Sequence, residues 1–219
     1  LNTVKQRGDY MSIKERRKNE KEEMKKKIMD ASIEIINQHG YENLSIRKIA
    51  TKIEYSPTTI YLYYKDKAEI ISDMTNKLYN TVESNAIDIM NNCSSLPIDK
   101  QIIEIMTSFI KTLSSEPEMA KSIMYSRMNI IFASENTNNT PSNNGIKMLD
   151  KFLSIGIEQG IFKKNIDKSS WMLISALLGF VLCVVENKLY SLHNFSQLIE
   201  NFLDILVGGL YNENSQQGY

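Results

Sequence analysis

Apolar residues recur at helical spacing along most of this chain of 219 residues. The clearest example lies near the amino terminus, where one apolar stripe follows the i, i+3, i+4, i+7 rule for a single buried helix face. That stripe consists of Ile46, Ile49, Ala50 and Ile53. Ser45 directly precedes it, and a serine there can cap the helix by accepting a hydrogen bond from a free N–H of the first turn. The pattern predicts a short helix that begins after Ser45.

A second short helix is predicted a few residues later. Ser56 is a good N-cap, and Pro57 then occupies the first helical position, where a missing N–H has no consequence. Ile60 and Tyr64 share the face that can pack on the preceding helix. Threonine and tyrosine hydroxyls on the other faces suit a DNA groove, because they can reach phosphates and base edges. The two helices favour a DNA-binding helix-turn-helix, with a plain hairpin in a helical bundle as the alternative.

Two segments, IMDASIEIINQHGYENLSIRKIA and YSPTTIYLYYKDKAEII, resemble the tetracycline-repressor (TetR) family of bacterial transcription regulators over residues 28–71. There are two departures. Glu54 stands in the turn where the family usually has glycine, and a non-glycine residue at positive φ is uncommon. Tyr63 stands where the family often has histidine. The resemblance implies an all-α fold with an N-terminal three-helix helix-turn-helix domain and a C-terminal helical bundle for ligand binding and dimerisation.

The same spacing divides the rest of the chain. Residues 1–18 show no sustained period and are expected to form a tail, with Met11 as a natural start and the residues before it of open origin. Residues 19–67 are expected to form the helix-turn-helix domain, in which Asn19 caps a first helix that Gly40 ends. Residues 68–219 are expected to form the regulatory and dimerisation domain. Its predicted helices span 68–92, 98–113, 119–132, 147–158, 168–190 and 195–210, with a polar loop at 134–144.

Charge is uneven although the formal net charge is zero. Residues 1–67 hold 15 Lys and Arg against 10 Asp and Glu, and the remainder holds 11 against 16. A basic end on a neutral chain suits a protein that touches nucleic acid with one part only, although a solvated charged helix explains it as well. Arg16, Arg17 and Lys18 form a small basic cluster, read as either a disordered tail or an arm that reaches DNA. We expect DNA contacts from Ser45, Arg47, Ser56, Pro57, Thr58, Thr59, Tyr61, Tyr63 and Lys67.

A ligand pocket is expected in the second domain. Eight of the 11 methionines follow Lys67, and methionine is frequent in adaptable binding surfaces as well as in ordinary cores. TetR-like regulators usually bind a small effector there, so the resemblance implies a small, largely apolar ligand. The candidate lining residues are Met106, Phe109, Met124, Met128, Phe132, Phe152 and Trp171.

Other features limit the function classes. Half-sites about one helical turn apart match a two-fold dimer. The resemblance implies that the last two helices form its interface, with a monomer core as the alternative. The two cysteines, Cys93 and Cys183, are far apart and are read as reduced, buried thiols, with a disulfide or redox switch as the alternative. We find no catalytic motif, metal cluster or cofactor loop. The chain is therefore expected to be a cytoplasmic, ligand-responsive repressor of a palindromic DNA operator, with no catalytic residue, cofactor, metal or membrane association. The alternative is a DNA-binding adaptor controlled by a protein partner or a metal.

Overall fold

The computed structural model describes residues 12–125, 144–166 and 169–212. Within these ranges the regular structure is helical, apart from one isolated bridge between Phe162 and Tyr211. The chain divides into two compact units, Leu1–Ile70 and Ile71–Tyr219, close to the expected boundary at Lys67. The prediction of an all-α fold is confirmed.

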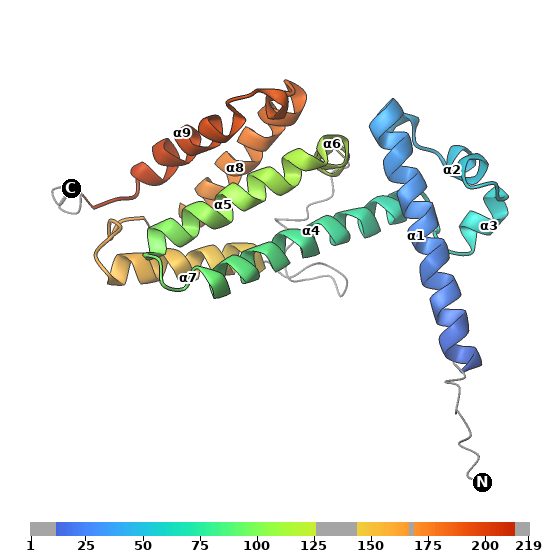
Figure 1. The fold of residues 1–219 in the computed structure, drawn as a ribbon, viewed down its shortest axis with the longest axis horizontal. Coiled ribbons are helices and arrows are strands. Elements are labelled where there is room, and N and C mark those ends of the chain that lie inside the picture. Colours follow the sequence, from blue (N-terminus) through green and yellow to red (C-terminus); the bar gives the residue numbers. More distant parts are fainter. Residues whose placement is uncertain (1–11, 126–143, 167–168, 213–219) are drawn as a thin grey trace, which may run out of the picture. The chain divides into compact units, whose positions relative to one another are not determined.

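The amino-terminal unit contains α1 (Ile13–His39), a 3-10 turn (Tyr41–Asn43), α2 (Ile46–Lys52) and α3 (Pro57–Tyr61), and it ends in the first residues of α4 (Lys67–Asn92) (Figure 1). α1 packs on both the 3-10 turn and α2, and α2 packs on α3. The core of this unit is aliphatic apart from one tyrosine. It is formed by Ile28, Ala31, Ile35, Ile36, Leu44, Ile49, Ala50, Ile53, Ile60 and Tyr64.

α1 begins earlier than the sequence predicts. The expected start was at Asn19, but the helix starts at Ile13 because a capping box forms just before it. The Ser12 hydroxyl accepts a hydrogen bond from the Glu15 amide at 3.2 Å, and a Glu15 carboxylate oxygen accepts one from the Ser12 amide at 2.8 Å. Residues 13–18 are therefore helical and do not form the expected tail.

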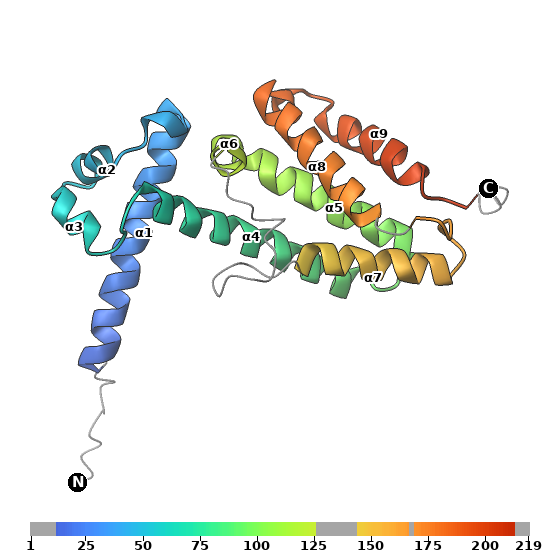
Figure 2. The same cartoon turned by 180° about the vertical axis from the view of Figure 1, so that it is seen from behind.

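The second unit continues along α4 and then contains α5 (Ile98–Ser115), α6 (Pro117–Tyr125), α7 (Asn144–Glu158), α8 (Ser169–Glu186), a 3-10 turn (Leu189–Ser191) and α9 (Phe195–Gly208). α5 packs against α6, α7, α8 and α9, and α8 also packs against α6 and α7 (Figure 2). Most of the expected loop at 134–144 lies outside the described residues, as does the end of the helix predicted over 119–132.

One helix of this unit is unusually apolar. α8 is long and apolar enough to cross a membrane by length and composition, with a mean hydropathy of 1.9 over an 18-residue window, of which 39% is buried inside the protein. Its buried residues face the other helices, including Leu173, Leu177 and Val181. A core helix of a bundle passes the same test, so composition alone is weak evidence for a membrane span. Cys183 lies on the outer side of α8 and is exposed, and Cys93 is half-buried, so the prediction that both thiols are buried is wrong.

Candidate nucleic-acid interface

The turn between α2 and α3 keeps the backbone shape that glycine usually provides. Glu54 lies in the left-handed region, with φ of 62°. The Tyr55 amide donates to the Ala50 carbonyl at 2.9 Å, and the Glu54 amide donates to the Thr51 carbonyl at 3.2 Å. This pair of bonds is the Schellman arrangement that ends a helix, with Glu54 at the position usually taken by glycine. The chain therefore makes the tight turn at the expense of local strain.

α3 is capped as the sequence predicts. The Ser56 hydroxyl accepts a hydrogen bond from the Thr59 amide at 3.1 Å and lies 2.9 Å from the Thr59 hydroxyl. Pro57 occupies the first turn. Ile60 is fully buried and Tyr64 nearly so, which anchors one side of the segment in the core of the unit.

The opposite side of α3 faces solvent. Tyr61 is 57% exposed, and both Pro57 and Thr58 are exposed, whereas Thr59 and Tyr63 are half-buried. Leu62 is 74% exposed and was not among the predicted contacts. The helical spacing predicts the exposure of Leu62, because Ile60 and Tyr64 face the core and Leu62 then lies beside Tyr61 on the outer face. The outer face of α3 is therefore an exposed surface of small, hydroxyl-bearing and apolar groups.

The α2 candidates lie at its first turn. Ser45 is half-buried and its hydroxyl accepts a hydrogen bond from the Lys48 amide at 3.3 Å, so its oxygen acts as the helix cap. Arg47 is exposed. An exposed guanidinium at the start of a helix has the reach and geometry to donate to a phosphate.

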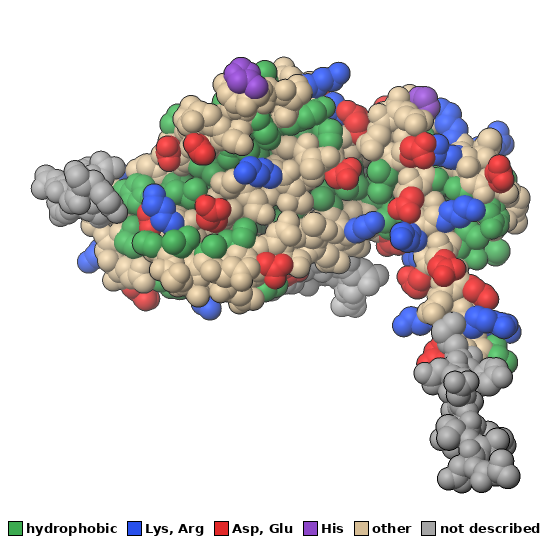
Figure 3. All heavy atoms as spheres, viewed as in Figure 1, with side chains coloured by type: hydrophobic (Ala, Val, Ile, Leu, Met, Phe, Trp, Pro, Cys, Tyr) green, Lys and Arg blue, Asp and Glu red, His purple; other side chains and the backbone are tan. Residues whose placement is uncertain are grey.

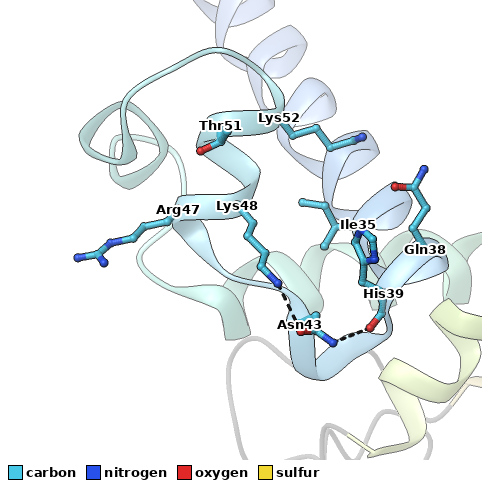
Figure 4. Close-up of a pocket in the computed structure, with 8 residues that line it drawn as sticks. All are labelled: Ile35, Gln38, His39, Asn43, Arg47, Lys48, Thr51 and Lys52. Carbon is cyan, nitrogen blue, oxygen red and sulfur yellow. Dashed lines mark hydrogen bonds between the residues drawn. The ribbon is translucent and has the colours of Figure 1, made fainter.

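An open hollow of about 540 Å³ lies between the end of α1 and one side of α2 (Figure 4). Lys48 Nζ donates to Asn43 Oδ1 at 3.4 Å, and Lys52 Nζ lies 2.5 Å from a Glu34 carboxylate oxygen. Two of the cations of the hollow are thus held by neighbouring groups, whereas Arg47 points away from them in Figure 4. The hollow is lined by Ile35, Gln38, His39, Asn43, Arg47, Lys48, Thr51 and Lys52.

Lys67 is engaged inside the unit. Its Nζ donates to the Tyr41 carbonyl at 2.8 Å and lies 3.8 Å from the centre of the Tyr41 ring. Burial lowers the pKa of Lys67, and the charge of Glu42 opposes that shift. The side chain therefore ties the start of α4 to the 3-10 turn, and a phosphate contact would use its remaining N–H groups.

The predicted ligand-binding residues fall in different settings. Met106 and Phe152 are buried, on α5 and α7, and Phe109 and Met124 are half-buried, on α5 and α6. Trp171 differs, because its side chain is 43% exposed at the start of α8. Met128 and Phe132 lie outside the described residues.

Comparisons with known proteins agree with this geometry. Residues 28–74 match the model of the bacterial regulatory proteins of the tetR family. The fatty acid metabolism regulator protein of Bacillus subtilis (strain 168) is 26% identical over 194 residues, which make up 85% of this chain and 95% of that protein. Both matches are to regulatory proteins.

Solved structures share the fold at lower identity. FadR from Bacillus subtilis, in complex with stearoyl-CoA, is 23% identical with a TM-score of 0.61, over 84% of this chain and 98% of that one. A ketosteroid transcriptional regulator of Mycobacterium tuberculosis is 14% identical with a TM-score of 0.63, over 87% and 96%. Together with the helix-turn-helix and its exposed α3, these findings support a transcriptional regulator of the TetR family.

Proposed function

We propose that this protein is a cytoplasmic repressor that binds a palindromic operator as a homodimer and leaves it when a fatty acyl thioester binds the second unit. The observation that carries the proposal is the outer face of α3, which is anchored by Ile60 and Tyr64 and left open at Pro57, Thr58 and Tyr61. An exposed helix of this kind fits the major groove, where hydroxyls and methyls read base edges.

The remaining candidates would position the unit on the duplex. Phosphate contacts fix register and orientation without reading sequence. Arg47 is exposed at the start of α2 and would make such a phosphate contact. Ser56 and Thr59 bond to each other and would shape the start of α3, with further contacts from Ser45, Tyr63 and Lys67.

The first test uses DNA selected by the full-length protein from a random-sequence pool. A regulator will enrich an inverted repeat whose half-sites are about one helical turn apart. Tyr61→Ala will weaken binding to that repeat by on the order of ten-fold, or about 1.4 kcal/mol, which lies within the range of about 1–3 kcal/mol for a lost base contact. Tyr61→Phe keeps the ring and separates the role of the hydroxyl from that of packing. Failure of the wild-type protein to enrich any sequence over random DNA would refute the proposal.

Exposed apolar surface on α8 and α9 supports the homodimer. The outward positions of α8 include Met172 and Gly179, and on α9 the side chain of Ile205 is 81% exposed. The rings of Phe180 and Phe202 stack at 4.0 Å between the two helices. Hydrophobic side chains reach the surface in this part of the molecule in Figure 3. Large exposed apolar side chains on neighbouring helices are typical of protein interfaces.

Ile205→Glu tests the dimer directly. It places a charge in the proposed interface, so the protein will shift from dimer to monomer in light scattering and lose operator affinity. Ile87→Glu on α4 is the matched control, because Ile87 is also exposed, at 48%, but lies on neither α8 nor α9. Equal behaviour of the two variants would contradict the assignment of the interface.

The effector proposal rests on the relatives and on side chains in the second unit. The matched Bacillus subtilis protein is a fatty acid metabolism regulator, and a similar structure was obtained with stearoyl-CoA. Met106, Phe109, Met124 and Phe152 supply flexible apolar surface on α5, α6 and α7 that suits an acyl chain. Such a ligand can release DNA only if it binds the released conformation more tightly than the operator-bound one.

Stearoyl-CoA, free CoA and stearate distinguish the parts of the effector. We expect stearoyl-CoA to raise the unfolding temperature and displace the selected operator, because a ligand at 100 times its dissociation constant stabilises the folded state by about 2.7 kcal/mol. Free CoA will have little effect, since it lacks the acyl chain. If none of the three changes operator binding, control by a protein partner or a metal becomes the better explanation.

A further inference from the structure

α1 is longer than its core requires. The helix begins at Ile13, but its first buried residue is Ile28, and residues 12–23 are all exposed. Figures 1 and 2 both show this part of α1 running on past α2 and α3. Residues 13–27 form about 22 Å of helix at 1.5 Å per residue. This segment, which we call the α1 extension, buries nearly nothing and needs another explanation.

Local interactions keep the α1 extension helical. The capping box of Ser12 and Glu15 satisfies its first amides, and Arg16 pairs with Glu20 at 3.5 Å. The extension also continues a helix that is already held by the core, so it avoids the entropic cost of helix nucleation. It therefore presents its side chains in a fixed order along one axis.

The charges of the extension divide between its faces. Residues 13–27 hold eight Lys and Arg against four Glu. Helical spacing places every one of the four Glu outside one stripe, which is purely cationic. That cationic face consists of Lys14, Arg17, Lys18, Lys21 and Lys25.

The cationic face is aligned with the helix-turn-helix. The same spacing continues from Lys25 to Ile28, Ser32 and Ile35, which are buried against the rest of the unit. Lys25 Nζ lies 4.7 Å from the centre of the Tyr64 ring, just after α3. The cationic face thus points to the side on which α2 and α3 pack, and it starts at the edge of the α3 segment.

We propose that the cationic face of the α1 extension binds the phosphate backbone of the duplex that flanks the half-site read by α3. This inference rests on the DNA-binding function proposed above. Duplex DNA carries about one negative charge per 1.7 Å of axis, which complements a row of cations along one face of a helix. An acidic protein would complement the charge equally well, but the continuity with α3 favours the duplex. The contact adds affinity and salt dependence and reads no bases.

Two charge-matched double variants test the proposal in the full chain. Arg17→Gln with Lys21→Gln removes two cations from the cationic face. Arg16→Gln with Lys26→Gln removes two cations from the other side of the same helix, so the change in net charge is identical. Helix content measured by circular dichroism will show that both variants keep the extension folded.

Binding is measured by fluorescence anisotropy against salt concentration, on the selected operator with long flanks and on the same operator trimmed to its half-sites. We expect the cationic-face variant to reduce the slope of log K against log salt by about 3.6, from about 0.9 for each of the four phosphate contacts that the dimer loses. Its affinity for the flanked duplex will fall by on the order of ten-fold at 0.1 M salt. The control variant will change neither value appreciably, and the trimmed duplex will abolish the difference between the variants.

The outcomes separate the two proposals. Equal losses in both double variants would show a general charge effect and overturn the role of the face. A difference between the variants that persists on the trimmed duplex would overturn the flanking contact. If the wild-type protein enriches no operator at all, the DNA-binding function itself fails before the extension is tested.

Discussion

Replacing Glu54 tests whether the turn between α2 and α3 is strained, because this residue has a left-handed backbone conformation with φ of 62°. A left-handed conformation costs a residue with a Cβ about 1–2 kcal/mol. Glycine avoids that cost but loses more chain entropy on folding, by about 0.5–1 kcal/mol. We therefore expect Glu54→Gly to stabilise the amino-terminal unit by about 1 kcal/mol.

Glu54→Ala is the matched control. Alanine keeps the Cβ that causes the strain and removes the same carboxylate, so it will stay within about 0.5 kcal/mol of the wild-type protein, as exposed substitutions usually do. The difference between the glycine and alanine variants isolates backbone strain. Any change in DNA affinity that the two variants share is the effect of removing a negative charge near α3.

Hydrogen exchange of peptides that span residues 45–64 is the suitable assay. The single tryptophan, Trp171, lies in the second unit, so its fluorescence does not report on this turn. A difference of about 1 kcal/mol corresponds to exchange about five-fold slower in the glycine variant than in the alanine variant. Exchange that is equal or faster in the glycine variant would show that the turn is not strained by its Cβ.

Three further substitutions have defined consequences for stability. Ser56→Ala removes the cap of α3 and will lower local stability by about 1 kcal/mol, seen as faster exchange in the same peptides. Gly156→Ala places a Cβ 2.2 Å from a carbon of the buried Phe162 ring, and will lower unfolding stability by about 1–3 kcal/mol in chemical denaturation. Adding Phe162→Leu will recover part of that loss, and simple additivity of the two changes would contradict the clash. Tyr211→Phe removes the 2.8 Å hydrogen bond to the buried Asp99 carboxylate, and will cost about 1–3 kcal/mol in the same measurement.

The sequence predicts the helices that bury a face and the residues that cap them. Periodicity at Ile46, Ile49 and Ile53 is enough to place α2, and Ser56 with Pro57 is enough to start α3. Apolar periodicity does not predict the α1 extension, because this segment buries almost no side chains and so has no repeating apolar positions. The signal that was present is the Ser12 and Glu15 pair three residues apart, which is a capping box.

Long-range contacts have no local signature. Lys67 carries the positive charge that a phosphate contact needs, yet its ammonium donates a hydrogen bond to the carbonyl of Tyr41, which is 26 positions earlier in the chain. The same holds for Tyr211, which reaches Asp99 across 112 positions. Such pairs depend on how helices pack, and single-sequence patterns describe only which face of each helix is buried.

The two sides of α8 explain why its composition is ambiguous. A soluble bundle normally leaves one side of a helix polar, but α8 buries Leu177 and Val181 on one side and carries Met172 and Gly179 on the other. A span surrounded by lipid would not need its first side packed against α5, α6 and α7. A small residue such as Gly179 on the exposed side allows a second helix to approach closely. A core helix is apolar on both sides when its outer face also forms a protein interface. The proposed dimer is therefore the simplest explanation for the high hydropathy of α8.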